Sequence, residues 1–437
     1  MFTADRLFGP AAVSSGTGLV HEPFLDRARA DRLRGDDASA RCALGAYLVA
    51  RLVDAWLELE DDAEASEEAR QGYTWQLEST NRYIGELDPD RPETRHLKGT
   101  IEALRATDRG RAAAAIRQQL TAYGFFLEQD GRLPEALDVI GLAGRVYRGA
   151  IPPADFTVLA LTAGRLLRLQ ARWEEATEMY GAAEAAASAV NERAAVLRSR
   201  LGQANVIWGQ GNLPRAREEI EQIINQADTP ELEEVRCRAY ADLAVVLELQ
   251  GLRIDALEAN YQAVRLARDP LLRMRMLGDL GVKLSHLGHY EEARLAFEIV
   301  VSANASFVVR TNAQLELMEL ESVVGNRVSF ERHRHELAEC ASRMPPSMAI
   351  DYRYKVGVGF ARFGRLARAR AAWEEARELA QEHGLNEWYF RLDRMLRYLD
   401  GCAACVAPHA GAEPTAVPQA VARVAAGLRE YAELAPA

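Results

Sequence analysis

A repeat of 37 to 40 residues runs through most of this chain of 437 residues. Each copy has a turn that opens with a small residue, and further small residues stand seven positions before it and five positions after it. The turn residues are Gly131, Ala171, Gly211, Gly251, Gly288, Gly325 and Gly364. Because stacked repeats bury their apolar surface against their neighbours, a chain of this length needs no single central core.

The small residues on both sides of each turn predict two antiparallel helices that approach each other closely. In six of the seven copies both small positions hold Gly or Ala. Larger residues fill the rest of the predicted interface, as Leu284 and Phe297 do in the copy that turns at Gly288. A glycine at the turn permits the left-handed backbone that ends a helix. Each copy is therefore predicted to be a helical hairpin.

This pattern resembles the tetratricopeptide repeat family over roughly residues 110–382. The resemblance implies a right-handed superhelical solenoid of antiparallel helical hairpins, in which the first helix of each hairpin lines the concave surface. The copies are longer than the family's usual length of about 34 residues, which suggests lengthened helices. The copy that turns at Gly325 departs most from the pattern, because Met318 and Phe330 take its two small positions.

The regions outside the repeats predict helical caps at both ends of an all-α chain. The expected parts are an N-terminal helical cap at 1–108, a solenoid of about seven hairpins at 109–382, a capping helix at 383–400, and a linker with a terminal helix at 401–437. Within the N-terminal cap, Trp56 and Trp75 are expected to anchor two amphipathic helices in the core. The linker is rich in Ala, Gly and Pro.

Composition excludes several classes of protein. A net charge of -11 argues against a nucleic-acid-binding protein, and no window approaches the 18 apolar residues typical of a membrane span. The start of the chain does not read as a secretion signal. The five cysteines are scattered, which favours a reducing cytoplasm. Lysine occurs only three times among 53 basic residues, a bias that we attribute to a GC-rich bacterial genome.

Two clusters of chemically reactive side chains are candidate sites. Cys402 and Cys405, with His409 nearby, have the spacing of half a zinc site or a redox pair, but without a second pair we favour two ordinary thiols. His333 and His335 stand two apart on a predicted helix, so they point to different sides and are expected on a solvent-exposed polar face. No phosphate-binding loop, dinucleotide fingerprint or nucleophile elbow is present, and we expect no enzyme activity, metal or cofactor.

The predicted concave surface carries the candidate binding residues. Arginine stands 13 positions before three successive turns, and further candidates stand six and three positions before the turns at Ala171 and Gly211. The candidates are Arg165, Arg168, Arg198, Asn205, Trp208, Arg238 and Arg275. Such a strip suits an acidic peptide or the C-terminus of a protein, because guanidinium groups bind carboxylates in pairs of hydrogen bonds. The alternative is that these arginines form intramolecular ion pairs, since Asp242 and Asp279 face the same region.

The sequence therefore predicts a cytoplasmic, non-enzymatic scaffold that binds a protein or peptide in its groove. The alternative is a regulatory sensor, in which a peptide or partner changes the superhelix and thereby controls an enzyme or a transcription factor. Both interpretations expect a protein or peptide partner, with no nucleic acid and no membrane.

Overall fold

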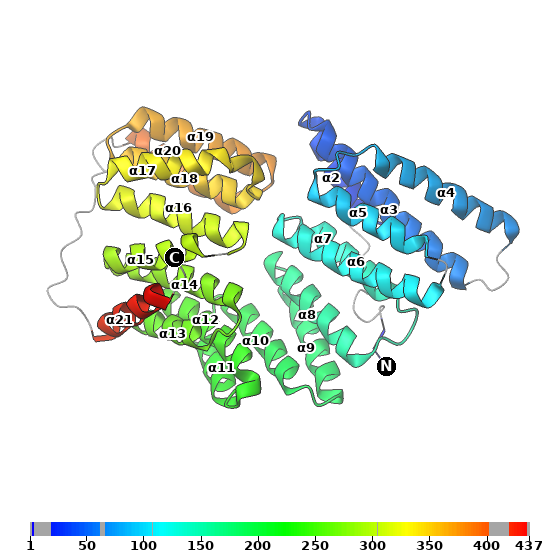
Figure 1. The fold of residues 1–437 in the computed structure, drawn as a ribbon, viewed down its shortest axis with the longest axis horizontal. Coiled ribbons are helices and arrows are strands. Elements are labelled where there is room, and N and C mark those ends of the chain that lie inside the picture. The colour runs from blue at the N-terminus through cyan, green and yellow to red at the C-terminus, as the bar shows by residue number, and fades with distance from the viewer. Residues whose placement is uncertain are drawn as a thin grey trace. The chain divides into compact units, whose positions relative to one another are not determined.

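The computed structural model describes residues 2–3, 19–61, 66–106, 108–303, 305–401 and 419–434, and these are almost entirely helical (Figure 1). The chain divides into two compact units after Gln210. Unit 1 contains α2 (Glu22–Leu33), α3 (Asp37–Asp61), α4 (Glu67–Gly85), α5 (Pro92–Leu104), α6 (Arg109–Gln129), α7 (Leu133–Arg145), α8 (Pro153–Leu169), α9 (Trp173–Ala189) and α10 (Arg193–Gly209). An isolated β-bridge joins Thr3 to Ala150.

Unit 2 continues the same pattern of short turns and antiparallel helices. It contains α11 (Leu213–Gln226), α12 (Glu233–Leu249), α13 (Arg253–Leu266), α14 (Pro270–His286), α15 (Tyr290–Ser302), α16 (Phe307–Val323), α17 (Arg327–Glu339), α18 (Pro346–Arg362), α19 (Leu366–Glu382), α20 (Asn386–Gly401) and α21 (Gln419–Leu434). Two short 3-10 helices, Pro230–Leu232 and Ala341–Arg343, precede α12 and α18. The predicted fold class, an all-α array of helical hairpins, is confirmed.

The predicted register of the repeat is also confirmed. All seven turn residues have left-handed backbone, with φ of 57° at Ala171 and between 73° and 90° at the six glycines. In the four copies that have glycine seven positions before the turn, this glycine receives a large residue of the second helix. A Cβ atom at Gly357 of α18 would lie 2.2 Å from Nε1 of Trp373 in α19, and one at Gly124 of α6 would lie 2.7 Å from Cδ1 of Ile140 in α7. Glycine at these positions is what lets the paired helices approach.

In the copy that turns at Gly325, large residues are buried at the two positions that hold small residues in the other copies. Met318 of α16 and Phe330 of α17 are both fully buried despite their size. The ring of Phe330 fits against a glycine of the next hairpin, since a Cβ atom at Gly359 of α18 would lie 2.2 Å from Phe330 Cε2. The large side chain is thus accommodated by α18, and the second helix of this copy departs from the regular packing.

In the N-terminal part, one of the two predicted anchors is correct and the other is wrong. Trp56 of α3 is buried, but the Trp75 side chain of α4 is 69% exposed. The apolar stripe of α4 consists of Tyr73, Leu77 and Ile84, which repeat at helical spacing and contact the core of unit 1. Trp75 lies two residues from Tyr73 and Leu77, so the helical turn of 100° per residue places it on the opposite side.

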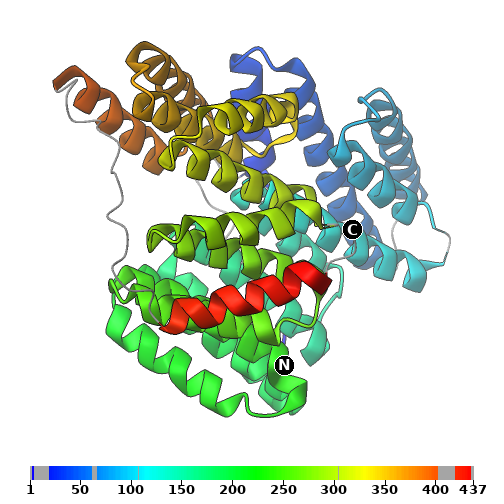
Figure 2. The same ribbon diagram turned by 60° about the vertical axis from the view of Figure 1, so that its left-hand side comes forward.

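The terminal helix α21 folds back onto the second helices α13 and α15 (Figure 2). Val421, Val424 and Leu428 are buried in this contact, and Arg423 forms an ion pair with Glu258 of α13. Cys402 and Cys405 lie outside the described residues, so the prediction of ordinary thiols remains a prediction. The predicted division of the chain at residues 108, 382 and 400 likewise remains a prediction.

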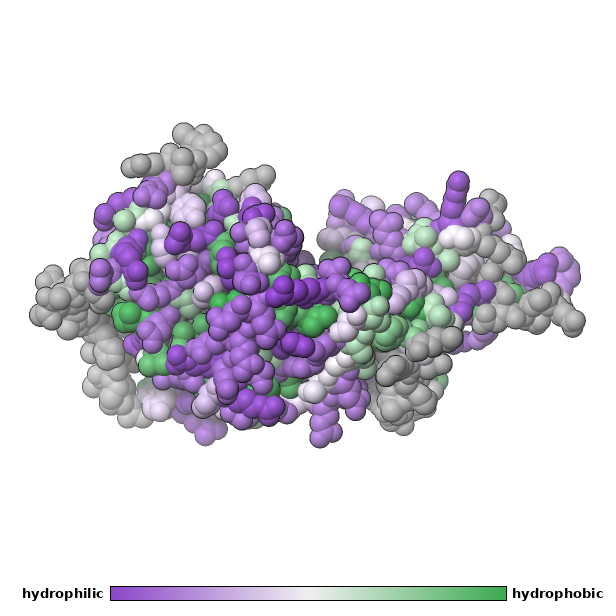
Figure 3. All heavy atoms as spheres, turned by 90° about the horizontal axis from the view of Figure 1, so that it is seen from below, coloured by the Kyte–Doolittle hydropathy of each residue, from purple (hydrophilic) through white to green (hydrophobic). Residues whose placement is uncertain are grey.

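Hydrophilic side chains predominate on the face of each unit drawn in Figure 3, because the apolar residues are buried between helices. The buried cores follow the units, with one cluster in unit 1 and two in unit 2. None of the described helices is both long and apolar enough to span a membrane.

Candidate functional site

Each hairpin presents one face of its first helix, defined here by the residues 13, 9 and 6 positions before its turn. These spacings of four and three residues place the side chains on one side of a helix. Successive first helices also contact one another, as α8 does with α10 and as α16 does with both α14 and α18. We call this surface the first-helix face, and it holds most of the candidate residues.

In unit 1, Arg165 of α8 is already paired. Its Nε and Nη2 atoms each donate to one carboxylate oxygen of Glu128 in α6, at 2.7 Å. Its guanidinium also lies 5.8 Å from the ring centre of Phe125. Arg168, one turn later, is half-buried, and its Nε makes no hydrogen bond to the described residues. Of this pair, Arg165 therefore fits the alternative of intramolecular ion pairs.

The candidates on α10 form one stripe. Trp208 Nε1 donates a hydrogen bond to Oδ1 of Asn205 at 3.0 Å, so the amide and the indole orient each other. Arg198 lies two turns before Asn205 on the same side of the helix. It is exposed, and its guanidinium forms no ion pair with the described residues. Arg198 is thus available to an external carboxylate.

In unit 2, one of the two candidate arginines forms an ion pair and the other does not. Arg238 of α12 pairs with Glu234 one turn earlier, with Nη2 and Oε1 3.0 Å apart, and both side chains are about half exposed. Arg275 of α14 is exposed and forms no direct ion pair with the described residues. Its charge acts on Asp279, one turn later on the same side of α14. Neither arginine directly pairs with the aspartates that the sequence had suggested as partners.

An acidic row runs beside the arginine row, and the sequence interpretation gave it too little weight. In unit 2 the residues 13 before the turns are Arg238, Arg275, Asn312 and Asp351. The residues nine before the turns are Asp242, Asp279, Glu316 and Lys355. The order of charges is therefore reversed in the hairpin that turns at Gly364. The first-helix face of unit 2 therefore carries both signs of charge.

Lys355 of α18 is the centre of the strongest charge cluster on this face. Its side chain is only 7% exposed, and its Nζ lies 2.6 Å from Glu316 Oε1, 2.9 Å from Glu319 Oε2 and 3.9 Å from Asp351 Oδ2. Burial opposes its charge, but the three carboxylates outweigh this effect and raise the pKa of Lys355. The cluster joins α16 to α18 and fixes the face at this end.

A second buried lysine joins α12 to α14. Lys283 Nζ and His286 Nδ1 each lie 2.6 Å from a different carboxylate oxygen of Glu248. Hydrogen bonds from His286 and Lys283 lower the pKa of Glu248 to about 2. Two of the three lysines in the sequence are thus buried in ion pairs. Their rarity in an arginine-rich protein is the sequence signal that could have identified them.

Two carboxyl groups on the face have unusual protonation. Surrounding protein displaces water from Asp351 and raises its pKa to about 6, although Lys355 opposes the shift. Asp279 is exposed at the surface, yet partial desolvation raises its pKa against the effect of Arg275. A ligand that brings a hydrogen-bond donor or a positive group to either carboxyl would stabilise its charged form and lower its pKa.

The predicted polar face at His333 and His335 is correct for only one of the two residues. The His335 side chain is 76% exposed, whereas that of His333 is 14% exposed and lines a cavity. His333 follows the buried Phe330 by three residues, which carries it toward the core side of α17. Within the described part of the protein, no three His, Cys, Asp or Glu side chains are grouped to hold a metal ion.

Comparisons with known proteins give only distant likenesses. No family model matches the chain, and no curated protein matches it significantly. The apo quorum sensor NprR from B. thuringiensis is 11% identical over 76% of this chain and 97% of its own, with a TM-score of 0.49. The Rap conjugation gene regulator of plasmid pLS20, solved with the Phr* peptide, is 12% identical over 85% and 99%, with a TM-score of 0.45. Apo RapI is 10% identical over 61% and 98%, with a TM-score of 0.42.

Proposed function

We propose that this protein is a non-enzymatic array of the tetratricopeptide type, each unit of which binds an extended peptide or the tail of a partner protein on its first-helix face. The observation that carries the proposal is the state of Arg198 and Arg275. Both occupy the same repeat position and are exposed, and neither forms a direct ion pair with the described residues. Arg165 and Arg238, by contrast, already have intramolecular carboxylate partners.

The chemistry of the two arginines favours a segment with carboxylate groups. A guanidinium group binds a carboxylate through two parallel hydrogen bonds, which gives both strength and orientation. Trp208 lies on the same stripe as Arg198 and offers an aromatic surface to the bound segment. In unit 2, Asp279 and Asp351 are suited to amide or amine donors of a bound segment, because a donor stabilises the charged form of a carboxyl group whose pKa is raised.

Fluorescence anisotropy with labelled peptides of equal length and acidic, neutral or basic composition tests the proposal. We expect the acidic peptides to bind most tightly, and Arg198→Gln with Arg275→Gln to weaken them about tenfold or more, since charged hydrogen bonds are lost. Arg215→Gln is the matched control, because Arg215 is exposed at the start of α11 and lies off the first-helix face. Equal binding by all three peptide classes would contradict the proposal.

The regulatory sensor remains the second candidate, and the docking of α21 favours it. A helix that packs on α13 and α15 through a few apolar residues can be displaced by a partner or by a change in the hairpins beneath it. If peptide binding released α21, the change would be available to a partner protein as a signal that peptide is bound. We further propose a bacterial, cytoplasmic setting from the arginine bias and the scattered cysteines.

A further inference from the structure

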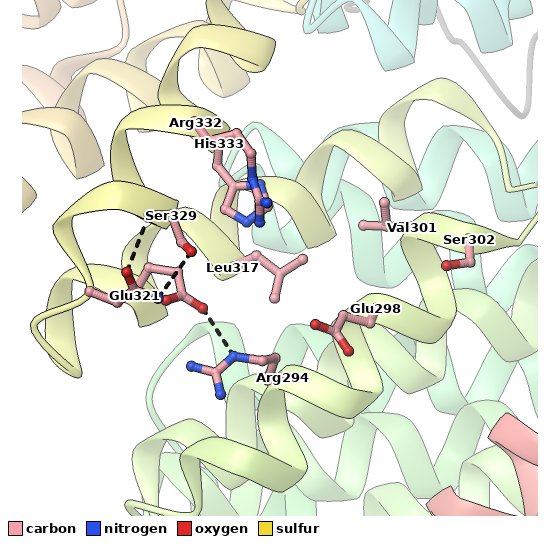
Figure 4. Close-up of a pocket in the computed structure, with 10 residues that line it drawn as sticks. Arg294, Glu298, Val301, Ser302, Leu317, Glu321, Ser329, Arg332 and His333 are labelled. Carbon is pink, nitrogen blue, oxygen red and sulfur yellow. Dashed lines mark hydrogen bonds and ion pairs between the residues drawn. The ribbon is translucent and has the colours of Figure 1, made fainter.

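A cavity of about 330 Å³ lies between α15, α16 and α17, and none of the candidate arginines lines it (Figure 4). It occurs in the copy that turns at Gly325, where Phe330 is directed into α18 and the regular packing is lost. Leu317 and Val301 supply apolar lining, and most other lining residues are polar or charged. A hollow of this size holds a small molecule.

Glu321 of α16 is the buried group that points to a ligand. Its side chain is only 4% exposed, and its Oε1 accepts a hydrogen bond from Arg294 Nε at 3.0 Å. Its second oxygen, Oε2, is buried and accepts no hydrogen bond from the described residues. A buried carboxylate oxygen that accepts no hydrogen bond is unfavourable. A ligand with a hydrogen-bond donor would satisfy this atom.

The opposite wall belongs to α17 and carries the guanidinium group of Arg332. Arg332 and His333 lie there, across Leu317 from Glu321 and Glu298 (Figure 4). The Nδ1 atom of His333 is buried and makes no hydrogen bond, although it lies 3.5 Å from Oε2 of Glu336 in the same helix. Arg332 is exposed and forms no ion pair with the described residues. On the acidic side, Glu298 of α15 is exposed and likewise forms no ion pair within the described part of the protein.

We propose that this cavity binds a free amino acid, meaning a small molecule with a protonated amine, a carboxylate and a short side chain. The amine donates to Oε2 of Glu321 and to Glu298, and the carboxylate accepts from Arg332 and His333. The ligand's side chain packs on Leu317 and Val301. A simple anion leaves Glu321 unbonded, and a simple amine leaves Arg332 unpaired, so the two walls together select a zwitterion.

Isothermal titration of the full-length protein with individual free L-amino acids tests this proposal. We expect at least one of them to bind, and expect alkylamines and short carboxylic acids of similar size to bind much more weakly. Glu321→Gln and Arg332→Gln should each weaken binding about tenfold or more, because each removes one charged contact. Glu339→Gln in α17 and Arg310→Gln in α16 are the matched controls, since both residues are exposed and lie off the cavity.

Three results would overturn the proposal. They are the absence of binding by any amino acid, equal binding by the amine or the acid alone, and unchanged binding in the two variants. If Glu321→Gln lowers stability because Arg294 loses its partner, Glu298→Gln and Arg332→Gln decide the question, as both side chains are exposed. The site does not overlap the arginines of the proposed peptide surface, so Arg198→Gln with Arg275→Gln should leave amino-acid binding unchanged.

Discussion

Gly281 of α14 lies so close to Phe297 of α15 that a Cβ atom at position 281 would come within 2.5 Å of Phe297 Cε1. The ring is only 1% exposed, so it has little room to move aside. We therefore expect Gly281→Ala to lower the free energy of unfolding by about 1–3 kcal/mol, as overpacking commonly does. Urea denaturation measures the change.

Gly278 provides a control on the same helix. A Cβ atom there would meet nothing within 4 Å, so Gly278→Ala should leave stability unchanged or raise it by up to about 1 kcal/mol through helix propensity. An equal loss of stability in both variants would contradict the assigned helix contact.

The repeat made most of this fold predictable. Turn glycines and small residues at fixed offsets are local features, so they identify the hairpins, their register and aromatic partners such as Phe297. Hydrophobicity alone misplaces Trp75, because its burial depends on its position relative to Tyr73 and Leu77. The sequence shows that Phe330 departs from the repeat pattern. It does not show that Phe330 packs against Gly359 of the following hairpin.

Lys355 should be essential to the stability of unit 2. Lys355→Met leaves Glu316 without its cation and leaves Glu319 with only Arg362, 3.7 Å away. Breaking a buried ion pair commonly costs about 3–5 kcal/mol. Because these carboxylates are 30% and 27% exposed, we expect the lower end, about 3 kcal/mol. Arg238→Gln, which removes an exposed pair with Glu234, should cost about 1 kcal/mol or less. Similar losses in the two variants, measured by urea denaturation, would rule out a special role for Lys355.

His21 should make the stability of unit 1 depend on pH. Its ring is buried, and Nδ1 lies 2.6 Å from Asp138 while Nε2 lies 2.9 Å from Asp54. Burial disfavours the charged ring, but the two carboxylates outweigh this and raise the pKa of His21 from 6.5 to about 9.

Because the folded pKa exceeds the unfolded one, this stabilisation is complete below pH 6.5 and is lost as the pH rises through 9. The loss should be on the order of 3 kcal/mol. Thermal unfolding of the wild type and of His21→Gln measures it across that range. The difference between the two proteins should shrink as pH rises, and a constant difference would argue against a charged His21.

The docking of α21 should depend on its apolar face. Leu428→Asp places a charge at a fully buried position, so we expect α21 to detach and its amide hydrogens to exchange about tenfold faster or more. Ala426→Asp adds the same residue on the exposed side of α21 and should leave exchange nearly unchanged. Mass-spectrometric hydrogen exchange reports both variants. Equal protection of α21 in Leu428→Asp and the wild type would contradict the packing.

The candidate surface was less predictable than the fold. The repeat offset correctly placed Arg198 and Arg275 on exposed parts of first helices. It could not show that Arg165 reaches Glu128, because that ion pair joins different hairpins at a distance of 37 residues in sequence. The cavity beside Glu321 was also hidden, since it is lined by residues of three helices and corresponds to no sequence motif.

Charge reversal at the first-helix face is the most direct test of the proposed peptide binding. Labelled acidic and basic peptides of equal length are titrated into the wild type and into the variant Arg198→Glu with Arg275→Glu, and their dissociation constants are compared. We predict that the wild type prefers the acidic peptide and that the variant prefers the basic one, because the sign of the available charge has been reversed at both positions. An unchanged preference for the acidic peptide in a folded variant would contradict binding at these arginines.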